Sequence, residues 1–191
     1  KNEEFIALAN EIAQLALDTK VDSIEALNAT EFKGSTVANI ILDNVAKIGE
    51  KIEVKKFETI EGKGLVPYIH MGYRMGVIVE LNQEVNEENG VIGKDVAMQI
   101  AAMNPVALDA SGVSEELIER ERAIAREKAI EGGKPENIIE RIVEGSVKAM
   151  LKESTLLSQP FVKDTKLSVE QYVKSKDKDL SVVSYKRMSL A

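Results

Sequence analysis

Apolar and polar positions alternate with a helical period in the first half of the chain. Apolar residues recur at the i, i+3, i+4, i+7 spacing of amphipathic helices in residues 2–17, in residues 37–48 and before Met103. Thr36 or Ser35 can cap the helix over residues 37–48, and Gly49 should end it, since glycine takes the left-handed conformation without steric penalty. A short helix through Leu27, capped by Asp22 or Ser23, and a helix from Val91 or Lys94 to Met103, ended by Pro105, complete this set.

The period changes to two in the middle of the chain. Residues 51–60 alternate between apolar and polar side chains, and residues 65–69 and 75–81 are short runs rich in β-branched residues. Glycines in residues 61–64 provide a turn. Three sequential strands with short connections predict an antiparallel meander with helices on one face. Residues 180–188 predict a final strand near the end of the chain.

Two further helices have a different character. Residues 114–131 and 135–152 are dense in Glu, Arg and Lys and carry only narrow apolar stripes. The tight turn at Gly132-Gly133-Lys134-Pro135 joins them. Two narrow stripes are buried most simply against one another, which predicts an antiparallel helical hairpin that projects from the domain. The hairpin is either a simple decoration or a dimerisation arm.

The predicted class is α+β, with two related halves in which antiparallel meander sheets pack against helices. In both halves a helix is followed by a strand, since residues 37–60 resemble residues 167–190 in pattern. We therefore expect an N-terminal half over residues 1–88 and a C-terminal half over residues 89–191. The second half includes the helical arm, residues 113–152.

Composition excludes several classes of function. The 191 residues are 44% hydrophobic but only 4% aromatic, so the core must be aliphatic. A net charge of −7 disfavours nucleic acid as a partner, because binding to phosphates requires basic surfaces. The absence of cysteine and the single histidine leave only oxygen ligands for a metal, and we expect no metal and no cofactor. No apolar run of membrane-spanning length and no signal peptide are visible, so a cytoplasmic protein is predicted.

The one histidine is the most conspicuous candidate for chemistry. His70 lies in a strand-turn-strand stretch, residues 68–81, whose predicted tip carries two glycines with Arg74 between them. An imidazole can act as a general base, which would require an enclosed pocket at the tip, but no nucleophile motif accompanies it. Such a histidine is more often a surface or interface group. Gly93-Lys94 does not form a phosphate-binding loop, because Asp95 stands where Ser or Thr is required.

Candidate interaction residues lie at the ends of predicted helices. Phe161 and Val162 follow a helix in the loop Gln159-Pro160-Phe161-Val162. Either Phe161 packs into the local core, or one of the two protrudes as an anchor for a partner. Ile48, beside the Gly49 stop, has the same two interpretations.

Several of these segments together resemble one family. They are the stretch from Tyr68 to Leu81, Lys47-Ile48-Gly49-Glu50, Ser158-Gln159-Pro160-Phe161-Val162, the Gly-Lys-Pro-Glu turn from Gly133, and Val143-Glu144-Gly145. In order and approximate spacing they resemble the bacterial translation elongation factor Ts family, and the resemblance extends over the whole chain. It implies a core of two related α+β halves with a coiled-coil arm.

The resemblance also implies a function without covalent chemistry. The family is a guanine nucleotide exchange factor for the translation GTPase EF-Tu, so the chain is not expected to be an enzyme in the covalent sense. By resemblance, Ile48, His70 and Val162 fall where the family touches EF-Tu, and Phe161 is their neighbour. The alternative is a non-enzymatic α+β dimerisation or interaction module, forming a homodimer through the arm and having no affinity for a GTPase.

The chain departs from the family pattern at its beginning. The family's N-terminal helical domain and its Thr-Asp-Phe-Val-Ala segment, whose Asp and Phe enter the GTPase near its magnesium and nucleotide, are not found in these residues. Residues 1–5 look like the residues that follow that segment. We therefore expect a fragment or trimmed product that retains much of the docking surface and exchanges nucleotide with reduced activity.

Overall fold

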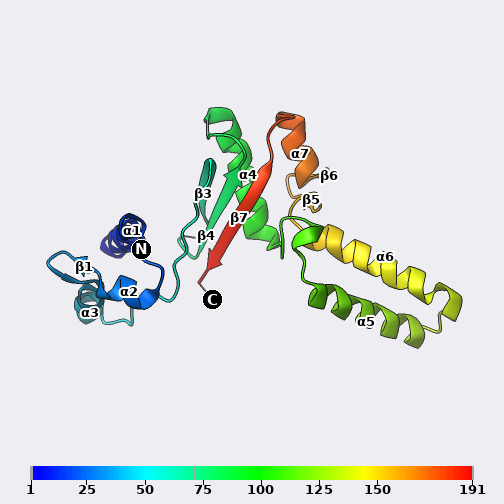
Figure 1. Ribbon diagram of the computed structural model, residues 1–191, viewed down its shortest axis with the longest axis horizontal. Helices are drawn as coiled ribbons and strands as arrows, with labels where there is room; N and C mark the ends of the chain where they lie inside the picture. Colours follow the sequence, from blue (N-terminus) through cyan, green and yellow to red (C-terminus); the bar gives the residue numbers. More distant parts are fainter. Residues whose placement is uncertain (1, 71, 191) are drawn as a thin grey trace. The chain divides into compact units, whose positions relative to one another are not determined.

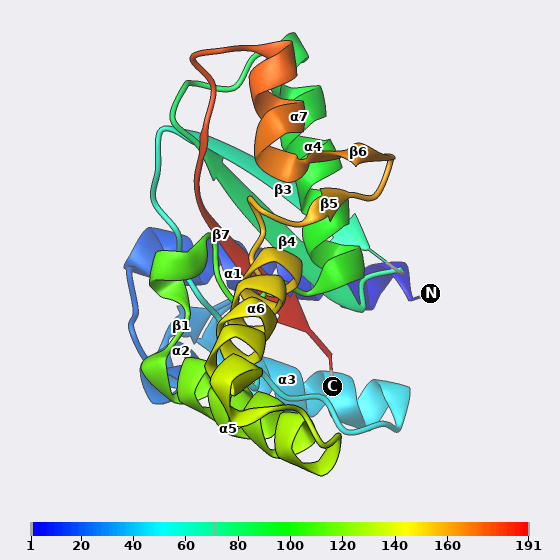
Figure 2. The same cartoon turned by 90° about the vertical axis from the view of Figure 1, so that its right-hand side faces the viewer.

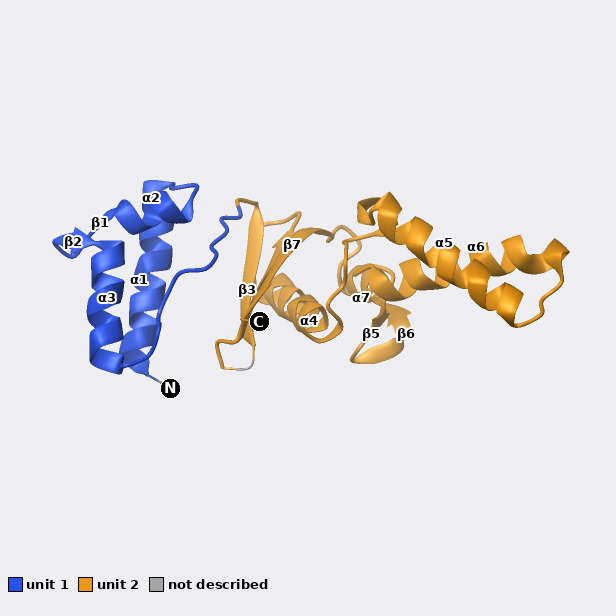
Figure 3. Cartoon of the chain, turned by 90° about the horizontal axis from the view of Figure 1, so that it is seen from below, with its two compact units in different colours: residues 1–60 blue, residues 61–191 orange. Residues whose placement is uncertain are grey.

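The computed structural model describes residues 2–70 and 72–190, and it has the predicted α+β character. The chain forms two compact units, residues 1–60 and 61–191 (Figure 3). Among the described residues, no helix has both the length and the apolar character needed to cross a membrane. Met71, at the predicted tip of the strand-turn-strand stretch, lies outside the described residues.

The first unit is helical, with one very short hairpin. In order it contains α1 (Glu3–Thr19), α2 (Ile24–Ala29), β1 (Glu31–Phe32), β2 (Ser35–Thr36) and α3 (Val37–Ile48). The predicted caps are confirmed, because the Ser23 hydroxyl accepts a hydrogen bond from the backbone of Ala26, and Thr36 accepts one from Asn39. The aliphatic core that joins the helices consists of Leu8, Ile12, Ala16, Leu27, Val37 and Ile41.

The strand predicted over residues 51–60 is wrong. Ile52, Val54 and Phe57 do turn toward the core of the first unit, as the alternation suggested, but the segment belongs to no sheet. A strand needs a neighbour to bond its N–H and C=O groups. No backbone–backbone hydrogen bond is described for residues 51–57. The pattern therefore correctly indicated which side chains face the core, but a period of two alone could not supply the missing partner strand.

The second unit is built on a three-stranded antiparallel sheet. β3 (Gly64–His70) pairs with β4 (Met75–Leu81), and β4 pairs with β7 (Val182–Ser189), giving the order β3-β4-β7. The third strand thus comes from the end of the chain, and the predicted meander of three sequential strands is corrected. α4 (Glu87–Met103) lies across one face of this sheet (Figures 1 and 2).

α4 begins earlier than predicted. Asn86 caps the helix by accepting hydrogen bonds from the backbone of Glu88 and Asn89, and the Asn89 side chain bonds back to the Asn86 backbone. The polar run from Asn86 to Gly90, which precedes the predicted start at Val91 or Lys94, is therefore a capping box and a first helical turn. Gly93 lies against Val66 of the sheet, where an added Cβ would come within 2.6 Å of that side chain.

A second short hairpin follows the arm. β5 (Pro160–Phe161) and β6 (Asp164–Ser168) lie beside α4 and lead directly into α7 (Val169–Lys176) (Figure 2). Ser168 and Gln171 form a capping box at the start of α7. Neither this hairpin nor β1–β2 was expected from the sequence, since strands of two residues, such as β1, β2 and β5, carry almost no periodicity.

The predicted helical arm is present. α5 (Glu115–Glu131) and α6 (Glu136–Ser154) follow a 3₁₀ turn (Ala110–Gly112) and lie side by side, extending away from the sheet of their own unit (Figure 1). Their buried seam is narrow and consists of Ala125, Ala129, Val143 and Val147. Ion pairs between Arg126 and Glu140 and between Arg122 and Glu144 bridge the two helices.

The compact units divide the chain at a different place from the two predicted halves. The halves were expected to meet between residues 88 and 89, whereas the units meet between residues 60 and 61. The reason is that β3 and β4 pair with β7 and pack against α4, so they belong with the later residues. The division into halves describes a repeat rather than compact units, and it stays a prediction.

Candidate partner-binding site

The loop that carries Phe161 and Val162 is the turn between β5 and β6. Phe161 pairs with Asp164 in the hairpin register, which leaves Val162 and Lys163 as a two-residue turn. The Phe161 side chain is only 2% exposed and stacks on Tyr172, with 4.0 Å between the ring centroids. Val162 is 43% exposed. Of the two interpretations, core packing describes Phe161 and exposure describes Val162, and a contact of either with a partner stays a prediction.

Two buried amides hold this turn from below. Gln99, on α4, is fully buried, and its Oε1 accepts a hydrogen bond of 2.8 Å from the backbone N–H of Val162. Its Nε2 donates to the carbonyl of Pro160 and to Oε1 of Gln159, each at 3.2 Å. Gln159 donates in turn to the carbonyl of Glu153, near the end of α6. Gln99 was not predicted as a functional residue, although an amide among the otherwise apolar residues 96–103 was a usable signal.

A carboxylate on α4, one helical turn before Gln99, also contacts the β5–β6 hairpin. Asp95, also on α4, accepts hydrogen bonds of 2.6 Å from the Tyr172 hydroxyl and from the Lys163 ammonium group. Burial, together with the hydrogen bond to Asp95, raises the pKa of Tyr172 well above its usual value. Asp95 thus links the turn residue Lys163 to the ring on which Phe161 stacks.

His70 ends β3 and is half-buried. Its Nδ1 lies 2.9 Å from the Tyr68 hydroxyl, a hydrogen-bonding distance between two side chains on the same face of the strand. Gly72 and Tyr73 beyond it adopt left-handed backbone conformations, which bring the chain round into β4. The imidazole is therefore oriented by a neighbour in its own strand, at the tip of the β3–β4 hairpin.

Ile48 is the last residue of α3, in the first unit. Gly49 follows it with a φ of 78° and donates its backbone N–H to the Val45 carbonyl at 2.8 Å, as predicted for a glycine that ends a helix. The Ile48 side chain is half-buried, so it is neither a core residue nor a freely protruding one.

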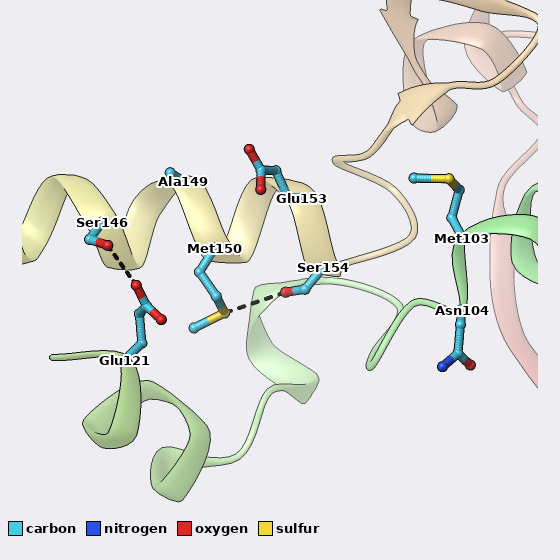
Figure 4. Close-up of a pocket in the computed structure, with 8 residues that line it drawn as sticks. All are labelled: Met103, Asn104, Glu121, Ser146, Ala149, Met150, Glu153 and Ser154. Atoms are coloured by element: carbon cyan, nitrogen blue, oxygen red, sulfur yellow. Dashed lines mark hydrogen bonds between the residues drawn. The ribbon is translucent and has the colours of Figure 1, made fainter. Parts of the chain in front are cut away.

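Two cavities lie in the described part of the chain, one in each unit. One, of about 440 Å³, lies where α4 ends beside the arm (Figure 4), and the second, of about 350 Å³, lies between α1 and α3. In the first, Ser146 donates to Glu121 at 2.5 Å and Ser154 donates to the Met150 sulfur, so four of its lining groups are paired with one another. Neither cavity is lined by His70, which gives no support to the acid–base interpretation of that residue.

The sequence was then compared with known proteins. It matches the elongation factor TS family over residues 1–191. It is 43% identical to elongation factor Ts of Porphyromonas gingivalis over 191 residues, which is all of this chain and 69% of that protein. It is 45% identical to elongation factor Ts of Amoebophilus asiaticus over 188 residues, 98% of this chain and 68% of the relative. The same factor of an Azoarcus species is 50% identical over 177 residues, 92% of this chain and 58% of its own length.

Proposed function

The chain belongs to the elongation factor Ts family, and on this premise we propose that it is a guanine nucleotide exchange factor that promotes GDP release from EF-Tu. The observation that carries the proposal is the family match over all 191 residues. The exchange proceeds by protein–protein contact alone, with no covalent step and no cofactor.

The mechanism follows from thermodynamic linkage. A factor that lowers the affinity of EF-Tu for GDP must itself bind the nucleotide-free GTPase more tightly, by the same factor. Each tenfold reduction in GDP affinity therefore requires about 1.4 kcal/mol of differential binding. Exposed apolar side chains held on rigid backbone are well suited to supply it, because little conformational freedom is lost on docking.

We propose that Val162, His70 and Ile48 form contacts with EF-Tu. Val162 is supported by its 43% exposure on a turn that is fixed on three sides by Phe161, Gln99 and Asp95. His70 is supported by its place at a hairpin tip, and Ile48 by its place at a helix end. Phe161 takes part by supporting Val162 from the core.

We further propose that these 191 residues alone exchange nucleotide more slowly than a full-length family member. They contain no Thr-Asp-Phe-Val-Ala sequence, the segment associated by resemblance with displacement of magnesium and nucleotide. Docking and displacement are then separable, and this chain retains the first more fully than the second.

The test is the release of a fluorescent GDP analogue from purified EF-Tu, titrated with this chain and, in parallel, with a full-length relative. We expect a saturable acceleration that is smaller at its plateau than that of the relative. Equal plateaus would contradict the reduced activity, and neither acceleration nor binding would contradict the exchange function itself.

A second candidate function is self-association through the arm. The observation that favours it is a set of apolar side chains on the arm that remain exposed, namely Leu117, Ile124, Ile130 and Ile138. Sedimentation equilibrium of the full chain tests it. A dimer that is lost on Leu117→Lys and Ile124→Lys substitution would support an arm interface, and a monomer at all concentrations would exclude it.

A further inference from the structure

We propose that Gln99 is a positioning residue that holds the Val162 turn in the conformation required for docking, with Asp95 as its partner on α4. This inference rests on the proposed function, because the docking partner is EF-Tu. Neither residue touches that partner directly in this scheme, since Gln99 is fully buried and the side chain of Asp95 is only 13% exposed.

The β5–β6 turn has an unusual backbone conformation for its length. Two-residue hairpin turns normally require positive φ at one or both turn residues, which matches the twist of the flanking strands. Neither Val162 nor Lys163 is among the described residues with positive φ. The β5–β6 turn therefore lacks the usual backbone solution, and its register shifts between Pro160 and Phe161. Some other interaction has to fix its geometry.

Gln99 makes the contacts that fix this turn. Its single amide group satisfies the N–H of Val162 and the carbonyl of Pro160, on both sides of Phe161. Buried backbone groups left without partners are costly, so the amide both removes that cost and selects one backbone conformation. Asp95, one turn earlier on the helix, fixes the other side of the turn through Lys163.

These contacts determine where the Val162 side chain lies. Its backbone is tied to Gln99 while its side chain remains exposed, and Phe161 is directed inward onto Tyr172. If the turn were free to reorganise, the same apolar side chain could fold onto the surface of its own unit. Gln99 and Asp95 thereby keep the Val162 side chain exposed, and they reduce the conformational entropy that the turn loses when Val162 docks.

The test is a double-mutant cycle on the affinity of the full chain for nucleotide-free EF-Tu, using Gln99→Met, Val162→Ala and the double variant. We expect each single substitution to weaken binding about tenfold, and the double variant to be no weaker than either single variant. Non-additivity is the signature of residues that act through one another. Full additivity, or an unchanged affinity for Gln99→Met beside a weakened Val162→Ala, would overturn the inference.

A matched control separates positioning from general loss of stability. Asn89 is another buried amide on α4, 3% exposed, and its side chain bonds to the backbone of Glu84 and Asn86, away from the turn. Asn89→Ala is expected to lower the melting temperature while leaving EF-Tu affinity within about twofold of the wild type. An equal loss of affinity for Asn89→Ala would assign the effect of Gln99→Met to stability alone.

A second readout requires no partner. Hydrogen exchange of the Val162 amide, measured by NMR on the isolated chain, should be slow in the wild type and at least tenfold faster in Gln99→Met. Slow exchange in both would overturn the positioning role whatever EF-Tu does. Conversely, failure of the wild type to bind EF-Tu would refute the proposed function but would leave this result standing.

Discussion

Each unit contains a long helix, a short β-hairpin and a helix that follows the hairpin, and the two hairpins differ in the residues of their turns. In the first unit, α1 and α2 precede the β1–β2 hairpin and then α3. In the second, α4 and the arm helices α5 and α6 precede the β5–β6 hairpin and then α7. The helix faces correspond, with Leu8, Ile12 and Ala16 buried on α1 and Ile92, Val96 and Ile100 buried on α4. Both hairpins have two-residue turns.

In each unit, an acidic residue of the long helix forms an ion pair with the lysine of the hairpin turn. Glu11, just before Ile12, pairs with Lys33 of the first turn, and Asp95, just before Val96, pairs with Lys163 of the second. One turn further on, however, the first unit has Leu15 and the second has Gln99. Lys33 and Gly34 both adopt positive φ, so the first turn is stable by its own backbone. The second turn is held by the side chains of Gln99 and Asp95. Its residues therefore need not tolerate positive φ, and one of them is the apolar Val162.

The aromatic residue beneath each turn should show the largest difference. Phe161→Ala removes a fully buried, stacked ring and is expected to destabilise the chain by about 3–5 kcal/mol. Phe32→Ala removes a half-buried ring beneath Lys33 and should cost about 1–2 kcal/mol. Urea unfolding, with hydrogen exchange to assign the loss to one unit, measures both. Similar losses would show that the two hairpins are supported alike.

Substitution of the acidic residue in each ion pair should show a smaller difference in stability between the two units. Asp95→Ala strips a largely buried carboxylate from two partners, and we expect a loss of about 2 kcal/mol. In Glu11→Ala both members of the lost ion pair are about half exposed, and the expected loss is below about 1 kcal/mol. Chemical denaturation of each variant beside the wild type provides the comparison. A larger loss of stability for Glu11→Ala than for Asp95→Ala would contradict the claim that the Asp95 ion pair contributes more to folding.

The turn backbones provide a third contrast. An alanine Cβ at Gly34 would meet open space, so the cost of Gly34→Ala is conformational and should be about 1 kcal/mol at a φ of 76°. Lys163→Ala needs no unusual backbone. It loses an ion pair in which Lys163 is half exposed, and Asp95 keeps the Tyr172 hydroxyl as a partner, so we expect a loss of about 1 kcal/mol or less. Thermal unfolding of the Gly34→Ala and Lys163→Ala variants measures the two losses of stability. A neutral Gly34→Ala would mean that the first turn does not depend on its left-handed backbone.

The pH dependence offers the smallest contrast. Burial and Asp95 raise the pKa of Tyr172, so the folded state retains the phenolic proton at a pH where the unfolded chain has lost it. The stabilisation is complete below the unfolded pKa near 10 and declines as the pH rises above it. Near pH 10.5 we expect a loss of about 1 kcal/mol or less in the second unit, and Tyr172→Phe should reduce it. Denaturation at pH 9 and 10.5 measures the difference, and an identical pH response in Tyr172→Phe would contradict the account.

The sequence predicted the long, strongly periodic parts of this fold well. The arm and the caps at Ser23 and Thr36 are local features, and the structure confirms them. The strand over residues 51–60 was wrong because pairing depends on a partner that periodicity cannot reveal. The pairing of β7 with β4, about one hundred residues apart, is equally non-local.

The candidate site was predicted only in outline. Motifs located the loop with Phe161 and Val162, but they could not say which of the two side chains faces the core. That choice depends on Tyr172 and on the hydrogen bonds of Gln99, which come from α7 and α4. A glutamine on an apolar helix face is the kind of local inconsistency that identifies such positioning residues in advance.

The most direct test of the account compares the two turns in one assay. The initial rate of release of a fluorescent GDP analogue from EF-Tu is measured with the wild-type chain, with Val162→Ala, and with Lys33→Asn, whose asparagine tolerates positive φ. We predict that the wild type accelerates release, that Val162→Ala loses about tenfold at subsaturating concentration, and that Lys33→Asn remains within about twofold. Equal rates for the wild type and Val162→Ala, or a larger loss for Lys33→Asn, would contradict the claim that the second turn is the docking element.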